Sequence, residues 1–171
     1  MTKKVLVATS LTAIFVVSML FAGSLTPAFA PPPPYGTVTG GSVTSNPAGN
    51  VYTFTVTTSG KIPHVPDTYI TTTAGLVAYG WLDGSGNAVV VAIHPGAVDS
   101  TQNPNNWHPH TATLDGSGCV TSLSDPQGGV AIKGSTLSLQ MRASVATVSP
   151  STFSGPPAAF TLVGGCVASL P

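Results

Sequence analysis

Three of the four histidines in this 171-residue chain lie close together in the sequence, at His94, His108 and His110. Residues two apart in an extended chain face the same side, so His108 and His110 can present both imidazoles to one ion. Pro109 stiffens this pair by fixing its own φ and restricting the residue before it. Because imidazole ligation without a thiolate suits Cu(II) or Zn(II) better than Mg²⁺ or Ca²⁺, the spacing predicts a copper or zinc site.

Asp99 lies in the connection between His94 and His108 and is predicted to be a fourth ligand or a partner of a ligating imidazole. A connection of about fifteen residues is long for a compact domain, which favours a functional role. The alternative is that the three histidines are ordinary loop residues, hydrogen-bonded to water. His64 lies farther away, between prolines, and is more typical of a turn.

Other chemistry has weaker support in the sequence. Ser85 and Ser117 each lie between two glycines, but neither has the glycine two residues earlier that a serine-hydrolase elbow requires. The five aspartates are scattered and do not single out the carboxylate pair of a glycosidase. An enzyme is therefore the less favoured interpretation. Trp107, beside asparagines and prolines, is predicted to be a surface residue available for contact with a carbohydrate or a protein.

The N-terminus has the parts of an export signal. Two lysines precede the apolar stretch Val5 to Phe21, and Ala28-Phe29-Ala30 is the small-x-small pattern after which signal peptidases cleave. Residues 1–30 are therefore predicted to be a signal peptide, and the mature chain to start at Pro31 outside the cytoplasm, secreted or at the cell surface. The alternative is an uncleaved membrane anchor, because an apolar run of about 17 residues is at the lower limit for spanning a bilayer.

The composition of residues 31–171 is that of a β protein. Thr, Val, Ser and Gly are abundant and glutamate is absent, which is typical of strands joined by tight turns. Three basic residues against five aspartates give this part of the chain a formal charge of −2. A nucleic-acid partner is disfavoured, because such binding needs a basic surface that neutralises phosphates.

The chain contains two cysteines, Cys119 and Cys166. Exported proteins meet oxidising conditions, so the pair is predicted to form a disulfide. A role as thiolate metal ligands is the alternative, which is disfavoured because each cysteine lacks the close Cys or His neighbour of a metal knuckle.

Short strand-like runs with Gly, Pro, Asn and Asp between them predict one all-β domain over residues 37–171, a β-sandwich of immunoglobulin-like or related Greek-key type. The segment Asp83-Gly84-Ser85-Gly86-Asn87 predicts a hairpin, and Asp115-Gly116-Ser117-Gly118 a second. The proline-rich residues 31–36 are expected to form an extended spacer outside the core. The expected strands are Thr37 to Thr44, Val51 to Thr58, Tyr69 to Thr73, Leu76 to Leu82, Ala88 to His94, His110 to Leu114, Val120 to Leu123, Val130 to Ile132, Thr136 to Val145 and Ala159 to Ala168.

Two segments also carry a resemblance to a known group of proteins. The leader that closes on Leu25-Thr26-Pro27-Ala28-Phe29-Ala30, together with Trp107-His108-Pro109-His110 and the later Cys119, resembles small secreted proteins of ammonia-oxidising archaea. The resemblance covers the leader and one short segment. It implies a setting outside the cytoplasm in which copper is in demand, and it implies no activity.

Three functional hypotheses follow from these patterns. The first is a secreted module that binds copper or zinc for storage, delivery or sensing. The second is a structural or adhesive surface domain without a metal, whose partners are cell-surface components. The third, a metal-dependent enzyme, ranks last because only the aspartates are available as general acid or base.

Overall fold

Runs rich in valine, threonine and small residues form ten β-strands in the computed structural model, which describes residues 31–97 and 102–170. The predicted signal peptide and Asp99 lie outside the described residues. The strands are β1 (Val38–Ser45), β2 (Val51–Thr58), β3 (Val77–Leu82), β4 (Asn87–Ile93), β5 (His108–Leu114), β6 (Val120–Ser124), β7 (Gly128–Lys133), β8 (Thr136–Arg142), β9 (Ala158–Val163) and β10 (Cys166–Ala168).

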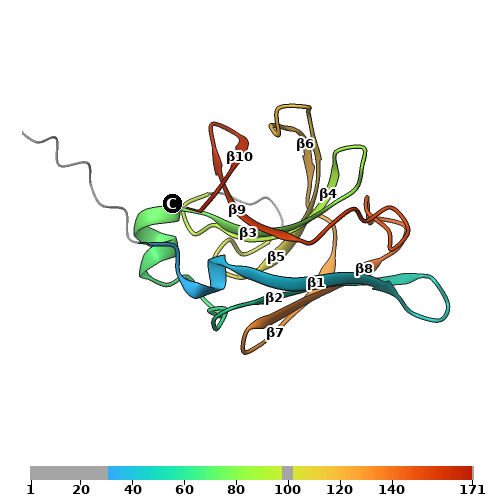
Figure 1. Ribbon diagram of the computed structural model, residues 1–171, viewed down its shortest axis with the longest axis horizontal. Helices are drawn as coiled ribbons and strands as arrows, with labels where there is room; N and C mark the ends of the chain where they lie inside the picture. The colour runs from blue at the N-terminus through green and yellow to red at the C-terminus, as the bar shows by residue number, and fades with distance from the viewer. Residues whose placement is uncertain (1–30, 98–101, 171) are drawn as a thin grey trace, which may run out of the picture.

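The strands form two antiparallel sheets that pack face to face, which confirms the predicted all-β sandwich (Figure 1). The four-stranded sheet has the order β1-β2-β8-β7, and the six-stranded sheet has the order β10-β9-β3-β4-β5-β6. The chain runs through β3, β4, β5 and β6 as a meander, passes through β7 and β8 in the other sheet, and returns to place β9 beside β3. A late strand that returns beside an early one is the connection that defines Greek-key arrangements.

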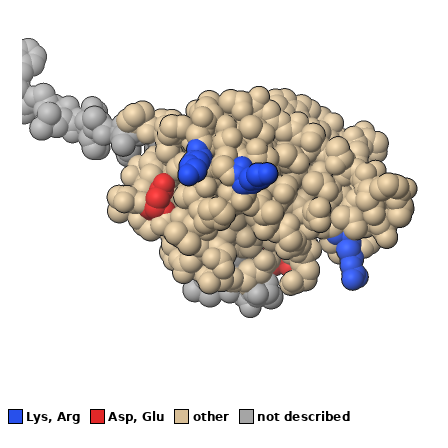
Figure 2. Space-filling view, turned by 90° about the horizontal axis from the view of Figure 1, so that it is seen from below, with Lys and Arg blue, Asp and Glu red and all other residues tan. Residues whose placement is uncertain are grey.

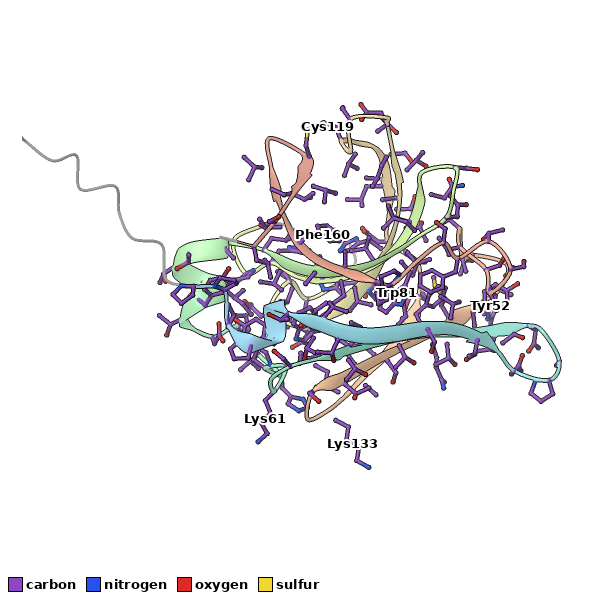
Figure 3. All side chains as sticks on the ribbon, in the orientation of Figure 1. Tyr52, Lys61, Trp81, Cys119, Lys133 and Phe160 are labelled. Carbon is purple, nitrogen blue, oxygen red and sulfur yellow. A yellow bond between two sulfur atoms is a disulfide. The ribbon has the colours of Figure 1, made fainter. Side chains whose placement is uncertain are left out.

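Alternating residues of the facing strands fill the space between the sheets. Phe54 of β2, Leu139 of β8 and Trp81 of β3 are fully buried there, and the ring of Trp81 lies edge-on to Phe54 at 5.6 Å between centroids (Figure 3). The indole N–H of Trp81 also donates a hydrogen bond of 3.2 Å to the carbonyl of Thr55. This bond ties the two sheets together and satisfies a polar group that burial would otherwise leave without a partner.

The six-stranded sheet curls away from its partner until its two edge strands approach each other. In Figure 1, β6 and β10 rise on opposite sides of the sheet. They meet through an antiparallel bridge between Cys119 and Cys166, which form the predicted disulfide. Hydrogen bonds of 3.0 Å from the N–H of Val120 to the carbonyl of Gly165, and from the N–H of Val167 to that of Gly118, flank the bridge. The curled sheet therefore encloses a concave face that is separate from the sandwich core.

Two expected strands differ from the structure in more than their end residues. The run Ala159 to Ala168 is divided into β9 and β10 by Gly164 and Gly165, whose positive φ values of 59° and 82° make a tight turn that favours glycine. The predicted strand Tyr69 to Thr73 is wrong.

In place of that strand lies a short π-helix, η2 (Ile70–Ala74). A carboxylate oxygen of Asp67 accepts a hydrogen bond from the N–H of Ile70, and the carbonyl of Asp67 accepts one from the N–H of Thr71. The hydroxyls of Thr71 and Thr72 donate to carbonyls one turn earlier, an alternative that hydroxyl residues have to pairing in a sheet.

The end of the proline-rich segment belongs to the core, contrary to the expectation that residues 31–36 are only a spacer. Tyr35 lies in a 3₁₀ turn, η1 (Pro34–Gly36), and only 5% of its surface is exposed. Its hydroxyl donates to the carboxylate of Asp67, and its carbonyl accepts a 2.8 Å hydrogen bond from the hydroxyl of Tyr79. Burial, followed by the hydrogen bond with Asp67, raises the pKa of Tyr35.

The surface carries few charges. Figure 2 shows basic side chains that lie apart from one another on a largely uncharged face. Within residues 31–97 and 102–170, no helix is long and apolar enough to cross a membrane.

Candidate metal centre

The three predicted histidines lie side by side at one end of the six-stranded sheet. His108 and His110 are the first and third residues of β5, and His94 follows the last residue of β4. The antiparallel register pairs Ala92 with His108 and Val90 with His110, so His94 lies two residues beyond the last pair, on the same face. Alternation along the strands directs all three imidazoles to the concave outer face, away from the sandwich core. The structure thus confirms that these side chains gather.

The ring nitrogens of the cluster converge. Nε2 of His94 lies 2.9 Å from Nε2 of His108, and one ring nitrogen of each histidine lies within 4.8 Å of the other two. Two zinc–nitrogen bonds of about 2.1 Å span at most about 4.2 Å, so nitrogens that all lie within 4.8 Å of one another are close to the spacing of ligands on one ion. The three histidines are also buried, with exposed fractions of 7%, 3% and 6% for His94, His108 and His110. The cluster could therefore hold a metal ion.

A backbone carbonyl sets the tautomer of His108. Its Nδ1 lies 2.7 Å from the carbonyl oxygen of Asn106, and a carbonyl can only accept a hydrogen bond. The proton of a neutral His108 is therefore on Nδ1, and its Nε2 carries a lone pair directed toward His94. With His108 in this tautomer, Nε2 of His94 is the donor in the 2.9 Å contact, and a bound ion would take the place of that proton.

A carboxylate sets the tautomer of His110 in the same way. Nδ1 of His110 lies 2.8 Å from a carboxylate oxygen of Asp125, whose side chain is 22% exposed. An ionised carboxylate accepts a hydrogen bond from the Nδ1–H group, so the lone pair of His110 is on Nε2 and can bind a metal ion. This is the carboxylate–histidine–metal arrangement that orients ligating imidazoles in many metal sites.

Asp125 was not predicted from the sequence, although the strand pairing explains its position. Strand β6 pairs with β5 so that Thr111 faces Ser124, which places Asp125 beside His110. The second predicted hairpin indicated this pairing, but an irregularity between Thr113 and Leu114 shifts the register by one residue. A regular hairpin counted from the pair Leu114 and Val120 would have placed Ser124 beside His110. The predicted hairpin therefore indicated that β6 pairs with β5, but the irregularity changed the register, so the residue beside His110 could not be derived.

Pro109 separates the two histidines of β5 without disrupting the sheet. Strand β6 ends opposite Thr111, so Pro109 has a strand neighbour, Val91 of β4, on one side only. A residue without an N–H is tolerated at such a position. The ring of Pro109 lies on the side of Gly128 in the other sheet, and the imidazoles on either side of it take the opposite face. The stiffness expected of His108-Pro109-His110 thus keeps both imidazoles on one face of the sheet, as the site requires.

Trp107 is not the surface residue that the sequence predicted. Only 7% of its surface is exposed, and its ring stacks on Tyr79 with 5.2 Å between centroids. Its indole N–H donates a 2.7 Å hydrogen bond to the carbonyl of Pro63. The three asparagines that precede it are exposed and Pro104 is half-buried, but alternation directs the residue before His108 into the sandwich core.

The remaining candidates lie elsewhere. His64 is exposed and does not belong to the cluster, as expected from its position between prolines. Asp99, the predicted fourth ligand, falls outside the described residues, so that interpretation stays a prediction. Asp83 and Asp115 are occupied in their hairpin turns, where their carboxylates accept hydrogen bonds from the backbone N–H groups of residues two and four positions later.

Comparisons with protein-family models, curated proteins and solved structures found no match for this chain. What the cluster can do therefore follows from its geometry. Three imidazoles that each place one ring nitrogen within 4.8 Å of the others, two of them oriented by a hydrogen bond at the other ring nitrogen, could form a neutral nitrogen donor set for one ion once His94 gives up its Nε2 proton.

Proposed function

We propose that this protein is a secreted or cell-surface β domain that binds one Cu(II) or Zn(II) ion through His94, His108 and His110. The observation that supports the proposal best is the convergence of three buried imidazoles, contributed by two adjacent strands, within 4.8 Å. Imidazole nitrogens are preferred ligands of both ions and poor ligands of Mg²⁺ and Ca²⁺.

The burial of the cluster argues against ordinary loop histidines. A histidine that only contacts water has no reason to be withdrawn from it, and the least exposed of the three, His108, is 3% exposed. Buried polar side chains are costly unless their hydrogen-bonding groups are satisfied. Here the oriented Nδ1 groups of His108 and His110 direct the opposite nitrogens toward a shared point, which is the arrangement that a metal ion uses.

The ligand set favours binding of the ion over catalysis by it. Asp125 is already engaged with His110 and acts by orienting a ligand. Three protein ligands leave room in the coordination sphere for water or for a small exogenous ligand. Storage, delivery or sensing of the ion is therefore the role that we propose.

The proposal is tested by titrating Cu(II) and Zn(II) into the full chain by calorimetry and by following thermal unfolding. With free metal at about one hundred times its dissociation constant, the folded state should gain about 2.7 kcal/mol. His108→Ala and His110→Ala should abolish most of this gain, whereas the exposed His64→Ala should behave like the wild type. Unfolding curves recorded without metal show whether each variant is folded. An equal response of all four proteins would leave the structural or adhesive hypothesis in its place.

The location outside the cytoplasm is part of the same proposal. The disulfide between Cys119 and Cys166 supports it, because disulfides persist in oxidising compartments. N-terminal sequencing of protein recovered outside the cell should begin at Pro31. An intact N-terminus on membrane-bound protein would favour the anchor instead.

A further inference from the structure

The concave face of the six-stranded sheet encloses a cavity of about 630 Å³ next to the histidine cluster. Side chains from all six strands line it, and the bridge between Cys119 and Cys166 joins the two strands that form its opposite walls. In Figure 3, Phe160 lies between those walls, on the sheet, with Cys119 at the far end of one of them. A cavity of this size is within the range of small-molecule sites.

Small side chains along the central strands create this space. Ala78 on β3, Ala88 and Ala92 on β4, and Ala112 on β5 are all buried and all line the cavity. Larger residues at these four positions would fill it. A sheet face that only had to exclude water would be expected to carry larger side chains that pack together.

The lining of the cavity is almost entirely apolar. Among the described residues that line the cavity, His94, His110 and Asp125 carry the polar side chains, and all the others are aliphatic, glycine or Phe160. Two of the lining residues, Leu123 and Val167, expose 58% and 41% of their surface, so apolar groups also remain in contact with solvent. A ligand that fits this lining has an apolar body and one polar group.

Charge defines the polar group. A divalent ion held by three neutral imidazoles brings two positive charges, and Asp125 beside His110 contributes one negative charge. One positive charge then remains at that end of the cavity, where no lysine or arginine is part of the described lining. A single carboxylate neutralises this charge and can occupy a coordination position left by the three histidines.

We propose that the cavity binds a linear aliphatic monocarboxylate, whose chain lies along the alanine-rich face and whose carboxylate coordinates the metal ion. This inference rests on the proposed metal site and names its ligand class. The aliphatic chain of the ligand contributes affinity because it leaves water, and the metal ion determines that the carboxylate end of the ligand enters the polar end of the cavity.

The first experiment is calorimetry on the zinc-loaded full chain with octanoate, decanoate and dodecanoate. Each added CH₂ group transfers about 0.8 kcal/mol, so affinity should rise up to about fourfold per carbon along the series. Acetate provides the carboxylate without the chain, and decanol provides the chain without the carboxylate. Both should bind at least about tenfold more weakly than decanoate. An affinity independent of chain length would overturn the proposal.

A cavity-filling variant provides the second experiment. Ala112→Phe places a large ring in the cavity and should weaken decanoate binding by more than tenfold while zinc binding is retained. Ala131→Phe is the matched control, because Ala131 is exposed on β7 in the other sheet. If both variants bind decanoate like the wild type, the cavity is not the site. If sedimentation shows a dimer that Ala112→Phe dissociates, a second copy of the chain occupies the cavity and the proposal is wrong.

These experiments separate the two proposals. Zinc binding without decanoate binding overturns the ligand proposal and leaves the metal site intact. If zinc does not bind at all, the proposed function fails, and equal binding of decanoate and decanol would then show that the carboxylate has no metal to coordinate.

Discussion

Asp125 and His110 are joined by a hydrogen bond of 2.8 Å, although they are fifteen positions apart in the sequence. The bond is possible because β6 runs antiparallel to β5 and brings the residue after Ser124 beside His110. It leaves Nε2 of His110 as the nitrogen that can meet an ion. Asp125 is thus a positioning residue for the proposed metal site.

Asp125→Asn should reduce metal affinity by about 10- to 100-fold, because an amide neither fixes the Nδ1 proton as strongly nor increases the basicity of the ring. Calorimetric titration with Zn(II) measures the change. Asp83→Asn, in the first hairpin turn and away from the cluster, is the control and should leave the affinity unchanged. Equal affinities of Asp125→Asn and wild type would show that the carboxylate does not support a ligand.

The disulfide should contribute strongly to stability. Replacing both Cys119 and Cys166 by serine should lower the free energy of unfolding by about 4 kcal/mol, since the bond closes a loop with a sequence separation of 47 residues. Urea unfolding of the variant and of the oxidised wild type measures the difference. Oxidised wild type should also show no free thiol when titrated under denaturing conditions. Two titratable thiols, or equal unfolding midpoints, would contradict the prediction.

Trp107 should behave as a core residue. Trp107→Ala should destabilise the fold by about 3–5 kcal/mol, because it removes a buried ring that stacks on Tyr79. Trp107→Phe keeps an aromatic ring and loses the hydrogen bond to Pro63, so it should cost about 1 kcal/mol. Thermal unfolding of the two variants gives both values. A loss below about 0.5 kcal/mol for the alanine variant would restore the surface interpretation.

Acid should weaken the fold through the two hairpin aspartates. Slight burial acts to raise the pKa of Asp83, but hydrogen bonds from the Asn87 side chain and from the N–H groups of Ser85 and Asn87 lower it below its ordinary value. The pKa of Asp115 is lowered by the hydroxyl of Ser117 and by the N–H groups of Cys119 and Ser117.

Because these pKa values are lower in the folded chain than in the unfolded chain, the stabilisation is present above the ordinary aspartate pKa of about 3.9 and is lost as the pH falls through the folded values. The free energy of unfolding, measured by urea titration from pH 6 downward, should therefore decrease in this region. Asp83→Asn should make that decrease shallower. Parallel curves for variant and wild type would contradict the assignment.

The fold was predictable where two neighbouring strands are joined by a turn with a recognisable sequence. The segment Asp83 to Asn87 has the glycines and the acceptor carboxylate that a hairpin needs, so the positions of β3 and β4 followed directly from local chemistry. Tyr69 to Thr73 misled because threonine favours strands in general, whereas here its hydroxyls bond to the preceding turn. The curvature that joins β6 to β10 has no local signature, because it depends on pairings between strands far apart in the sequence.

The site was predictable only in part for a similar reason. His108 and His110 share a face by simple alternation, and their proximity to His94 requires only that β4 and β5 pair. Asp125 required the register of a further strand, which one irregular residue shifts. The side of Trp107 followed from the same alternation that places His108 outward, but the polar neighbours of Trp107 obscured it.

The bridge between β6 and β10 also affects the tendency of this protein to self-associate. Edge strands present unpaired N–H and C=O groups that can recruit a strand from another molecule, a common route to aggregation. Here the N–H groups of Val120 and Val167 are already bonded across the bridge, to Gly165 and Gly118. If the bridge opened, two edges flanked by the exposed Leu123 and Val163 would become available at once. A chain in which the disulfide between Cys119 and Cys166 has not formed would therefore tend to self-associate, and the disulfide-bonded chain avoids this.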